Sequence, residues 1–340
     1  VVFSEGKGLK TITSQEVNEI LSEKVGVPFP HLTQEEKTRL TNLEEIIHKR
    51  LINQEVAVEL IAKTLRAKQT GVIDEKRPIG SFLFMGPTGV GKTQTAKVLA
   101  NVYFGNSDAI LRFDMAEYAG SEGLERLIGS VNNNLPGKLT TEIKNRPVSL
   151  LLLDEIEKAT PEIYNLLLAL LDEGIITDAF GKKVICSNLF VIATSNAAAE
   201  YVREQVSSAI KGEELQRKVT EYVLQKGFFS PEFLNRFDGV VVYEPLQESD
   251  LVKVARLMLT ELTQNLKKKN IYLTIADEVA EKIAKEGYNP AQGARPMRRI
   301  VEIDLGDLLG RALLSGELKA DDKVKIIPGT NKGEYSWEKI

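Results

Sequence analysis

Two patterns of apolar and polar residues alternate in the centre of the chain. Runs in which nearly every residue is apolar or small predict short buried strands, at residues 81–85, 109–114, 149–154 and 188–194. The segments between them carry apolar residues three or four positions apart and predict helices, at residues 91–103, 139–144 and 163–173. Continuously apolar strands between helices are typical of a parallel sheet with helices on both faces. We therefore expect an α/β fold here, a parallel αβα sandwich.

After Pro245 the pattern changes to longer amphipathic segments. It predicts a smaller, mostly helical α+β domain, with helices at residues 250–270, 277–286 and 297–315 and strands at residues 271–275 and 323–327. Before the sheet, residues 33–71 predict helix with a break, because apolar residues recur there at helical spacing. Residues 1–40 are interpreted as a connector, with a short helix at residues 11–21 capped near Ser14. The expected division is therefore 1–40, 41–246 and 247–340.

Composition and charge exclude several classes of protein. Hydrophobic residues make up 43% and charged residues 27%, the profile of a folded globular chain. The 44 basic and 48 acidic residues give a net charge of −4, so broad non-specific nucleic-acid binding is not expected. Even the longest apolar run, residues 166–171, is far too short to span a membrane, and no membrane partner is expected.

Cysteine usage bears on the compartment. Cys186 is the single cysteine, so an internal disulfide is excluded, and with two histidines besides, a Cys/His zinc site is not expected. A reducing compartment, the cytoplasm or another, is expected from this. The chain begins at Val1 with no signal-peptide pattern, and we interpret it as a fragment of something longer or as a processed chain.

Residues 86–93 satisfy the pattern G-x-x-x-x-G-K-[ST]. The segment follows a predicted strand and opens a predicted helix, so its backbone N–H groups can surround a phosphate at a helix N-terminus. A glycine-rich turn is the alternative, which the strand and helix context disfavours. The expected ligand is ATP or ADP. Lys92 is expected to reach the β- and γ-phosphates of ATP, and the Thr93 hydroxyl to ligate Mg²⁺. The residues expected to bind nucleotide here are Thr88, Gly89, Val90, Gly91, Lys92, Thr93 and Gln94.

A second candidate motif ends the strand at residues 149–154. Two adjacent acids at the end of a buried apolar strand are costly unless they have partners. Asp154 is expected to hold Mg²⁺ through water, and Glu155 to polarise the attacking water. Acids at strand ends are common, so this motif indicates a Mg²⁺ and water site only because a phosphate loop precedes it in the chain.

Six segments, in this order along the chain, resemble the second ATPase module of the two-ring Clp unfoldases and disaggregases, members of the AAA+ superfamily. They are residues 77–93, 113–118, 154–159, 193–196, 230–238 and 293–299. The resemblance extends over about residues 11–327, nearly the whole chain. It implies an AAA+ P-loop NTPase domain, followed by a small lid domain. Residues 1–40 then correspond to the end of a preceding module and its linker.

The resemblance implies further roles in the reaction. Asn196 resembles the sensor that positions water against the γ-phosphate, although an Asn at a strand end can also cap a turn. Arg236 resembles the arginine finger that reaches the γ-phosphate of a neighbouring subunit, with a surface ion pair as the alternative. Arg295 resembles the second sensor, in the lid domain. Leu51 and Ile52 match apolar residues that line the adenine pocket, with ordinary helix packing as a rival interpretation.

A finger that acts between subunits implies a ring, and the family norm is a hexamer. Unfolded or aggregated protein clients are the implied partners. The family normally has Gly before Gln54, where this chain has Asn53.

One expected substrate-gripping loop departs from the family pattern. Residues 130–138 include three consecutive Asn residues and lack the Tyr that the family uses. Aromatic rings grip any polypeptide through apolar contact, which Asn cannot do. Val131 and Leu135 are the apolar candidates for a weaker grip. The alternatives left open are a ring that no longer threads by this loop, or a loop for one specific partner.

A second expected pore-facing segment, residues 177–183, carries Phe180 at a Gly-flanked turn. Phe180 is hypothesised to replace the missing Tyr in part, against the alternative that its ring folds back on a hairpin. Residues 197–229 lack the tripeptide with which some Clp members dock on a peptidase, so no peptidase partner is expected.

Three functions therefore compete. The first is a motor that couples ATP hydrolysis to protein unfolding, disaggregation or remodelling. The second is a non-threading, ATP-gated protein that remodels one dedicated partner, favoured by the Asn-rich loop. The third is a nucleic-acid loader, disfavoured by the acidic balance and the lack of a basic, aromatic stripe.

Overall fold

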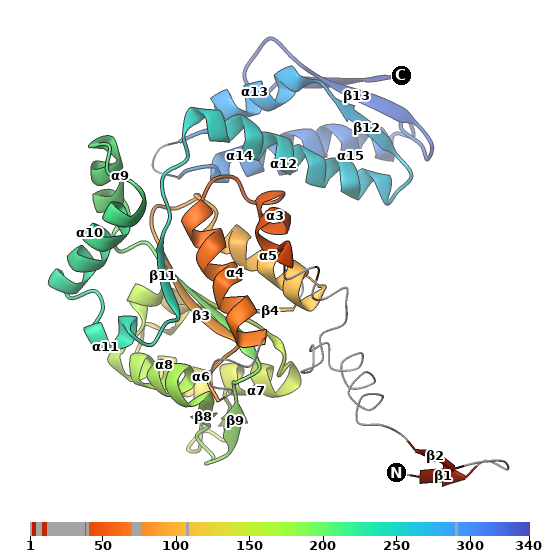
Figure 1. Cartoon of the computed structure of the whole chain (residues 1–340). Coiled ribbons are helices and arrows are strands. Elements are labelled where there is room, and N and C mark those ends of the chain that lie inside the picture. Colours follow the sequence, from red (N-terminus) through yellow and green to blue (C-terminus); the bar gives the residue numbers. More distant parts are fainter. Residues whose placement is uncertain are drawn as a thin grey trace.

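The computed structural model describes residues 2–4, 9–11, 38, 41–69, 76–106, 109–289 and 292–340. Within these residues the chain forms a large α/β body and a smaller one, with the C-terminus in the smaller (Figure 1). Two short strands near the N-terminus, β1 (Val2–Ser4) and β2 (Leu9–Thr11), pair antiparallel where only a connector was expected. The helix expected at residues 11–21 falls, beyond the end of β2, outside the described residues.

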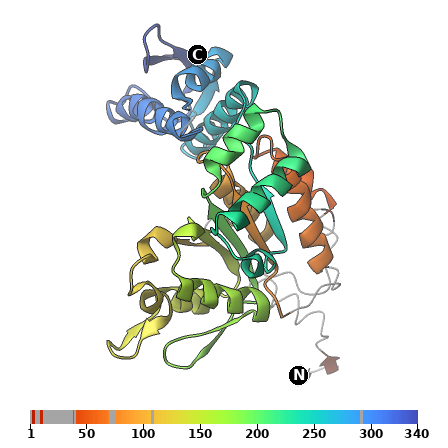
Figure 2. The same cartoon turned by 90° about the vertical axis from the view of Figure 1, so that its left-hand side faces the viewer.

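The large body contains a sheet of five parallel strands in the order β11-β3-β10-β7-β4. Its strands are β3 (Gly80–Met85), β4 (Ile110–Asp114), β7 (Ser149–Asp154), β10 (Leu189–Ser195) and β11 (Gly239–Val242). The first four were expected and β11 was not. Helices cover both faces, so the expected αβα sandwich is confirmed (Figures 1 and 2).

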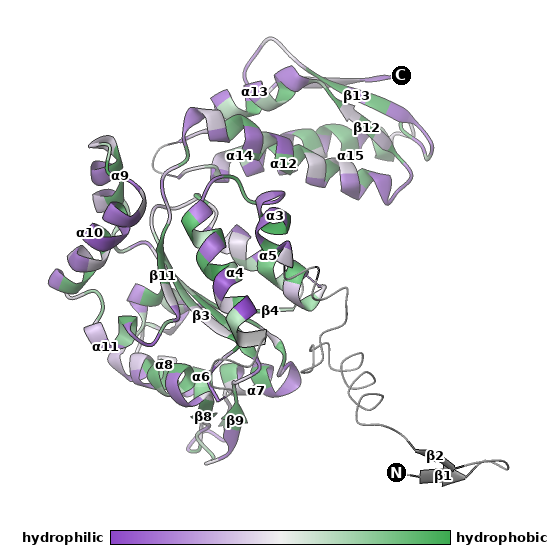
Figure 3. Ribbon diagram, viewed as in Figure 1, coloured by the Kyte–Doolittle hydropathy of each residue, from purple (hydrophilic) through white to green (hydrophobic). Residues whose placement is uncertain are grey.

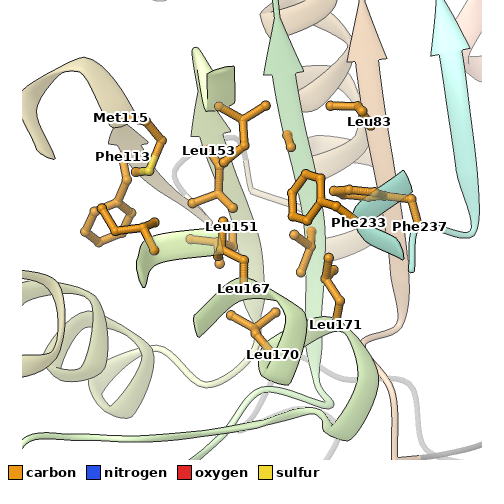
Figure 4. Close-up of a cluster of buried hydrophobic side chains, with 14 of the residues drawn as sticks. Leu83, Phe113, Met115, Leu151, Leu153, Leu167, Leu170, Leu171, Phe233 and Phe237 are labelled. Atoms are coloured by element: carbon orange, nitrogen blue, oxygen red, sulfur yellow. The ribbon is translucent and has the colours of Figure 1, made fainter. Parts of the chain in front are cut away.

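Alternate residues of each central strand enter the cores on opposite faces of the sheet, as the period of a strand requires. In β7, Leu150 and Leu152 pack in one core, and Leu151 and Leu153 in the other. Both cores consist of buried apolar side chains, which explains why the strands appear in the sequence as continuous hydrophobic runs (Figure 3). Figure 4 shows the second core, in which Phe233 and Phe237 pack near the sheet.

Two groups of helices fill these cores. One face is covered by α3 (Leu43–His48), α4 (Glu55–Gln69) and α5 (Lys92–Phe104). The other is covered mainly by α6 (Gly123–Ile128), α7 (Lys138–Asn145), α8 (Pro161–Glu173), α9 (Ala199–Ser207), α10 (Gly212–Gln225) and α11 (Pro231–Leu234). The single-turn helices η1 (Met115–Tyr118) and η2 (Ile156–Lys158) follow strands β4 and β7.

Two antiparallel hairpins lie at the end of the large body away from the small one (Figures 1 and 2). They are β5 (Gly129–Ser130) with β6 (Leu135–Pro136), and β8 (Ile175–Thr177) with β9 (Lys183–Ile185). They contain the two segments expected to contact a polypeptide.

The small body has its own apolar core. It comprises α12 (Glu248–Lys267), β12 (Tyr272–Ile275), α13 (Asp277–Gly287), α14 (Arg295–Arg299), the π-helix η3 (Ile300–Leu305), α15 (Gly306–Leu314), β13 (Lys323–Pro328) and β14 (Tyr335–Lys339). The single helix expected at residues 297–315 is thus one helical stretch with a π-helical middle. Strand β14, which was not expected, completes a three-stranded sheet in the order β12-β13-β14.

Candidate functional site

A cavity of 1110 Å³ lies between the two bodies, above the carboxyl ends of β3, β7 and β10. Open parallel sheets bind their ligands at this edge. The residues expected from the sequence to bind nucleotide or metal line it together: Leu51, Ile52, Thr88, Gly89, Val90, Gly91, Lys92, Thr93, Gln94, Asp154, Glu155, Asn196 and Arg295. Arg236, the remaining expected catalytic residue, is not in its lining.

The phosphate loop connects β3 to α5, in the strand–loop–helix context that the motif requires. Gly89 has a φ of +76° and packs so tightly that a Cβ there would lie 2.2 Å from the Gln292 carbonyl oxygen. Only glycine fits this position, for reasons of both backbone conformation and space. At Gly89 the loop therefore packs directly against the backbone of residues 292–294, and it leads into the N-terminus of α5, where a phosphate can bind.

Lys92 is buried at the start of α5, facing the strand ends. Its Nζ donates to the Gly86 carbonyl at 2.5 Å, to the Pro87 carbonyl at 2.8 Å and to Asn196 Oδ1 at 2.8 Å. Burial lowers the pKa of Lys92 to about 7, although the nearby Glu157 and Asp154 carboxylates oppose that shift. An anionic ligand would favour the charged ammonium, so this Lys is suited to a phosphate.

Asp154 ends β7 as a buried carboxylate. Its Oδ1 accepts a hydrogen bond from Thr194 Oγ1 at 2.9 Å, and its Oδ2 accepts one from Arg112 Nε at 2.7 Å. Thr93 lines the same cavity. A hydroxyl and a carboxylate are oxygen donors of the kind that Mg²⁺ prefers, so the residues present fit this ion. Arg112, on β4, was not singled out by the sequence analysis.

Glu155 follows Asp154 with a φ of +54°, which is uncommon for a non-glycine residue. Its N–H donates to Thr194 Oγ1 at 3.4 Å. Strained backbone of this kind persists where the surrounding structure enforces it, and it often marks a functional site. Here the turn directs Glu155 into the lining of the cavity.

Asn196 follows the last residue of β10 and accepts hydrogen bonds from both Lys92 and Thr88 through Oδ1. Its own backbone N–H donates to Glu157 Oε1 at 3.0 Å. Sequence reasoning missed Glu157, which lies two residues beyond Glu155. An acid on the turn after the acidic strand was the available signal. The structure shows that this carboxylate connects that turn to Asn196.

Leu51 and Ile52 come shortly before α4, and their contact with adenine stays a prediction. Leu51 is 4% exposed and belongs to the core, yet both residues line the cavity. The adjoining turn also explains a family difference, because Asn53 and Gln54 have φ values of +62° and +75°. Glycine adopts such values freely and Asn tolerates them better than most residues.

The small body closes the cavity from the other side. Arg295 begins α14 and lines the cavity. The preceding backbone packs directly on the phosphate loop: the Ala294 N–H donates to the Gly89 carbonyl at 3.2 Å. Arg298 also lines the cavity. Its Nη2 lies 3.6 Å from Glu261 Oε2 and its Nη1 lies 3.3 Å from Glu302 Oε1.

Arg236 lies elsewhere, just after α11. Its Nη2 is 3.4 Å from Asp172 Oδ2 and 3.8 Å from Glu232 Oε1, and its side chain is 36% exposed. The structure therefore brings the other expected catalytic residues together and leaves Arg236 on the surface of the large body.

The two hairpins carry the three apolar residues expected to contact a polypeptide. Val131 and Leu135 on the β5–β6 hairpin are 61% and 59% exposed, and Phe180 at the β8–β9 turn is 43% exposed. Phe180 lies beside the other hairpin, since a Cβ at Gly129 would be 3.4 Å from its ring. The Ala179 N–H donates to the Ile128 carbonyl at 3.1 Å. The two hairpins thus form one surface.

Asp178 orders the turn that carries Phe180. Its Oδ1 accepts from the Phe180 N–H at 3.0 Å and from the Lys182 N–H at 2.8 Å, and its Oδ2 contacts Lys144 Nζ at 2.7 Å. Hydrogen bonding to Lys144 is the main reason that the pKa of Asp178 lies below its ordinary value. The exposed ring is therefore held on an ordered turn.

In the part of the chain that the structure describes, no helix is both long and apolar enough to cross a lipid bilayer.

Two family models match the chain. The AAA domain (Cdc48 subfamily) matches residues 77–240, and the C-terminal D2-small domain of ClpB protein matches residues 246–326. Together they account for the large body from just before β3 and for most of the small body.

Curated relatives match nearly all of the chain. The chaperone protein ClpB of Oceanobacillus iheyensis is 40% identical, with 97% of this chain and 42% of that protein covered. The ATP-dependent Clp protease ATP-binding subunit ClpC of Staphylococcus epidermidis is 40% identical, with 94% and 40% covered. The chain thus spans less than half the length of these relatives. A solved chain of Hsp104, in a closed-state reconstruction with ATPγS and FITC-casein, matches with a TM-score of 0.81, 28% identity and 96% of this chain and 56% of that chain covered.

Proposed function

The chain belongs to the Clp group of AAA ATPases, and from this premise we propose that it forms one subunit of a ring that uses ATP hydrolysis to unfold, disaggregate or remodel other proteins. The observation that carries the proposal is the convergence of Lys92, Asp154, Glu155, Asn196 and Arg295 on one cavity between the two bodies. These residues come from four distant segments, and no structural role requires them to meet.

Each of these side chains has a separate role in ATP hydrolysis. Lys92 binds the β- and γ-phosphates, and Arg295 contacts the nucleotide from the small body. Thr93 and Asp154 would hold Mg²⁺, which supplies positive charge to the phosphate oxygens when bound. Glu155 accepts a proton from the attacking water, which Asn196 positions against the γ-phosphate.

Arg236 completes the site of a neighbouring subunit. Its position outside the cavity of its own chain supports this, together with its exposure and its weak pairing with Asp172. A guanidinium supplied in trans stabilises charge that develops on the transferred phosphoryl group. A homo-hexameric ring, as the resemblance implies, would provide that neighbour.

The surface formed by the two hairpins is the part that we assign to the polypeptide client. Phe180, Leu135 and Val131 present apolar side chains to solvent there. Apolar contact is tolerant of sequence, which suits a client of unspecified sequence. Because the small body contacts the phosphate loop through Ala294 and Gly89, nucleotide turnover can change the relative positions of the two bodies and thereby move the hairpins.

A second candidate function is non-threading remodelling of one dedicated partner. It is favoured by the β5–β6 hairpin, where Asn132, Asn133 and Asn134 occupy the connection between the strands and the family's aromatic residue is lacking. Asn side chains favour specific hydrogen bonds over general apolar grip.

One experiment separates the two functions. The full-length protein is incubated with ATP and a stable, tagged fluorescent protein, while loss of fluorescence and phosphate release are recorded in the same sample. Unfolding with hydrolysis supports threading. Hydrolysis without unfolding supports a dedicated partner, and no hydrolysis by an assembled, nucleotide-bound ring contradicts both.

The finer expectations about partners and location remain part of this proposal. We expect no peptidase partner and no nucleic-acid partner, and a reducing, cytoplasmic location. Absence of stable binding to single-stranded DNA at physiological salt checks the second of these.

A further inference from the structure

A second arginine supports the backbone that carries Arg236. Arg77 lies three residues before β3, and its side chain is 27% exposed. Its Nε donates to the Leu171 carbonyl at 3.1 Å, its Nη2 donates to the Arg236 carbonyl, and its Nη1 lies 3.8 Å from Asp238 Oδ1. A guanidinium is planar and its donors point in fixed directions, so these three contacts fix where the Arg236 carbonyl can lie.

The same backbone is fixed to the central sheet on its other side. Asp238 Oδ2 accepts from the Ser81 N–H at 2.8 Å and from Ser81 Oγ at 2.9 Å, and the Asp238 N–H donates to the Ser81 carbonyl at 2.8 Å. Ser81 is the second residue of β3, the strand that leads into the phosphate loop. The position of Arg236 is therefore tied to the strand that bears its own subunit's nucleotide site.

The Arg236 side chain is held far less firmly than its backbone. Its nearest acidic partners lie at 3.4 and 3.8 Å, and within the described residues its buried Nε has no hydrogen-bond partner. Exposed ion pairs of this kind contribute little stability. The guanidinium can therefore leave Asp172 for a stronger anion, while the backbone stays in place.

We propose that Arg77 is a positioning residue for Arg236, which it aims at the nucleotide site of the neighbouring subunit. The inference rests on the proposed function, because it takes Arg236 to act in trans. Arg77 is not among the residues that line the cavity of its own subunit. Its loss acts on the neighbour's site and leaves the nucleotide site of its own subunit intact.

Mixed rings of the full-length protein test this. Arg77→Ala subunits keep a working phosphate loop and have a misplaced finger, whereas Lys92→Ala subunits keep the finger and have a disabled loop. Each homogeneous ring should hydrolyse ATP about tenfold or more slowly than the parent ring. An equal mixture should recover activity, to about a quarter of the parent rate for random assembly, because half of the subunits have intact loops and half of those face an intact finger. Arg236→Ala mixed with Lys92→Ala is the matched control.

The outcomes separate the claim that Arg236 acts on the neighbouring subunit from the claim that Arg77 positions Arg236. If the Arg236→Ala mixture recovers activity and the Arg77→Ala mixture does not, Arg77 acts within its own subunit and the inference is wrong while the trans finger stands. If neither mixture recovers, the trans finger itself fails, and the inference fails with it. Equal recovery in both mixtures supports the inference, as does an Arg77→Ala/Arg236→Ala ring no slower than the Arg236→Ala ring.

Assembly and binding of a fluorescent ATP analogue are checked first for each variant. Should Arg77→Ala not assemble, Arg77→Lys replaces it, since an ammonium keeps the charge but cannot contact three separate acceptors in the same geometry. Failure of both variants to assemble would make Arg77 a structural residue and overturn the proposal.

Discussion

Replacement of Glu157 by Gln tests whether the acid that sequence reasoning missed controls the reaction. Glu157 Oε1 accepts the Asn196 N–H at 3.0 Å, so a charged acceptor fixes the backbone of the residue expected to position water. Hydrogen bonds to charged groups contribute about 1.5–3 kcal/mol, and neutral ones about 0.5–1.5 kcal/mol. Glu157→Gln keeps the shape and an acceptor oxygen but loses the charge, which amounts to a difference of about 1–1.5 kcal/mol, or roughly tenfold in rate.

The assay is steady-state ATP turnover by the assembled ring, with nucleotide affinity measured separately. We expect kcat to fall about tenfold in Glu157→Gln and further in Glu157→Ala. The Kd for ATP should change less than about threefold, because Glu157 does not line the cavity itself and contacts it only through the Asn196 backbone. Glu117→Gln, on the exposed surface after β4, is the matched control and should leave kcat unchanged. A Glu157→Gln ring with the parent kcat would refute the reasoning, since the charge would then be irrelevant to the position of Asn196.

Four further predictions follow from the same structure. Glu155→Gln should slow hydrolysis by about 100-fold or more while ATP stays bound and the ring persists in gel filtration; hydrolysis at the parent rate would contradict its role as base. Ile52→Ala should weaken ATP binding by about tenfold in fluorescence titration with little change in the urea midpoint, whereas a stability loss without an affinity loss would favour the packing interpretation. Thr95→Val should lower the free energy of unfolding by about 1–3 kcal/mol in urea, more than Tyr243→Phe at about 1 kcal/mol, because Tyr243 is fully buried and its hydroxyl donates to Thr95 Oγ1 at 2.9 Å. Phe180→Ala should reduce client-stimulated ATP turnover severalfold and leave basal turnover unchanged. Unchanged stimulation would show that the Phe180 side chain does not contact the client.

Much of the large body could be predicted because its strands are buried on both faces. A strand such as Ser149–Asp154 has no polar face to interrupt its apolar run, so composition alone identifies it. Helices α9 and α10 were missed although the signal was present: Leu215, Val219 and Val223 recur every four residues and are buried. The edge strand β14 was missed because, of its five residues, only Tyr335 is buried, so the strand has no apolar run. The edge strand β11 was missed although its valines, residues 240–242, form a short apolar run.

The sequence by itself determined the chemistry that resides in contiguous segments. The phosphate loop and the acid pair Asp154–Glu155 at the end of β7 each need particular residues at fixed spacing, and that spacing can be read directly from the sequence. The resemblance to the Clp ATPases pointed to Asn53 only as a difference from a usual Gly, and the structure adds that Asn53 has a φ of +62°.

Tertiary structure alone decided the contacts between distant segments. Arg77 and Arg236 are 159 residues apart, and Arg112 and Asp154 are 42 apart, yet each pair is in hydrogen-bond contact. Arg77 has no sequence pattern of its own that separates it from a solvated surface charge, and the position of Glu157 after the acidic strand does not show which group it contacts. The parallel order of the strands decides both contacts at opposite edges of the sheet. It brings the carboxyl ends of β7 and β10 together, where Glu157 meets Asn196, and it brings the amino ends of β3 and β11 together, where Arg77 meets Asp238.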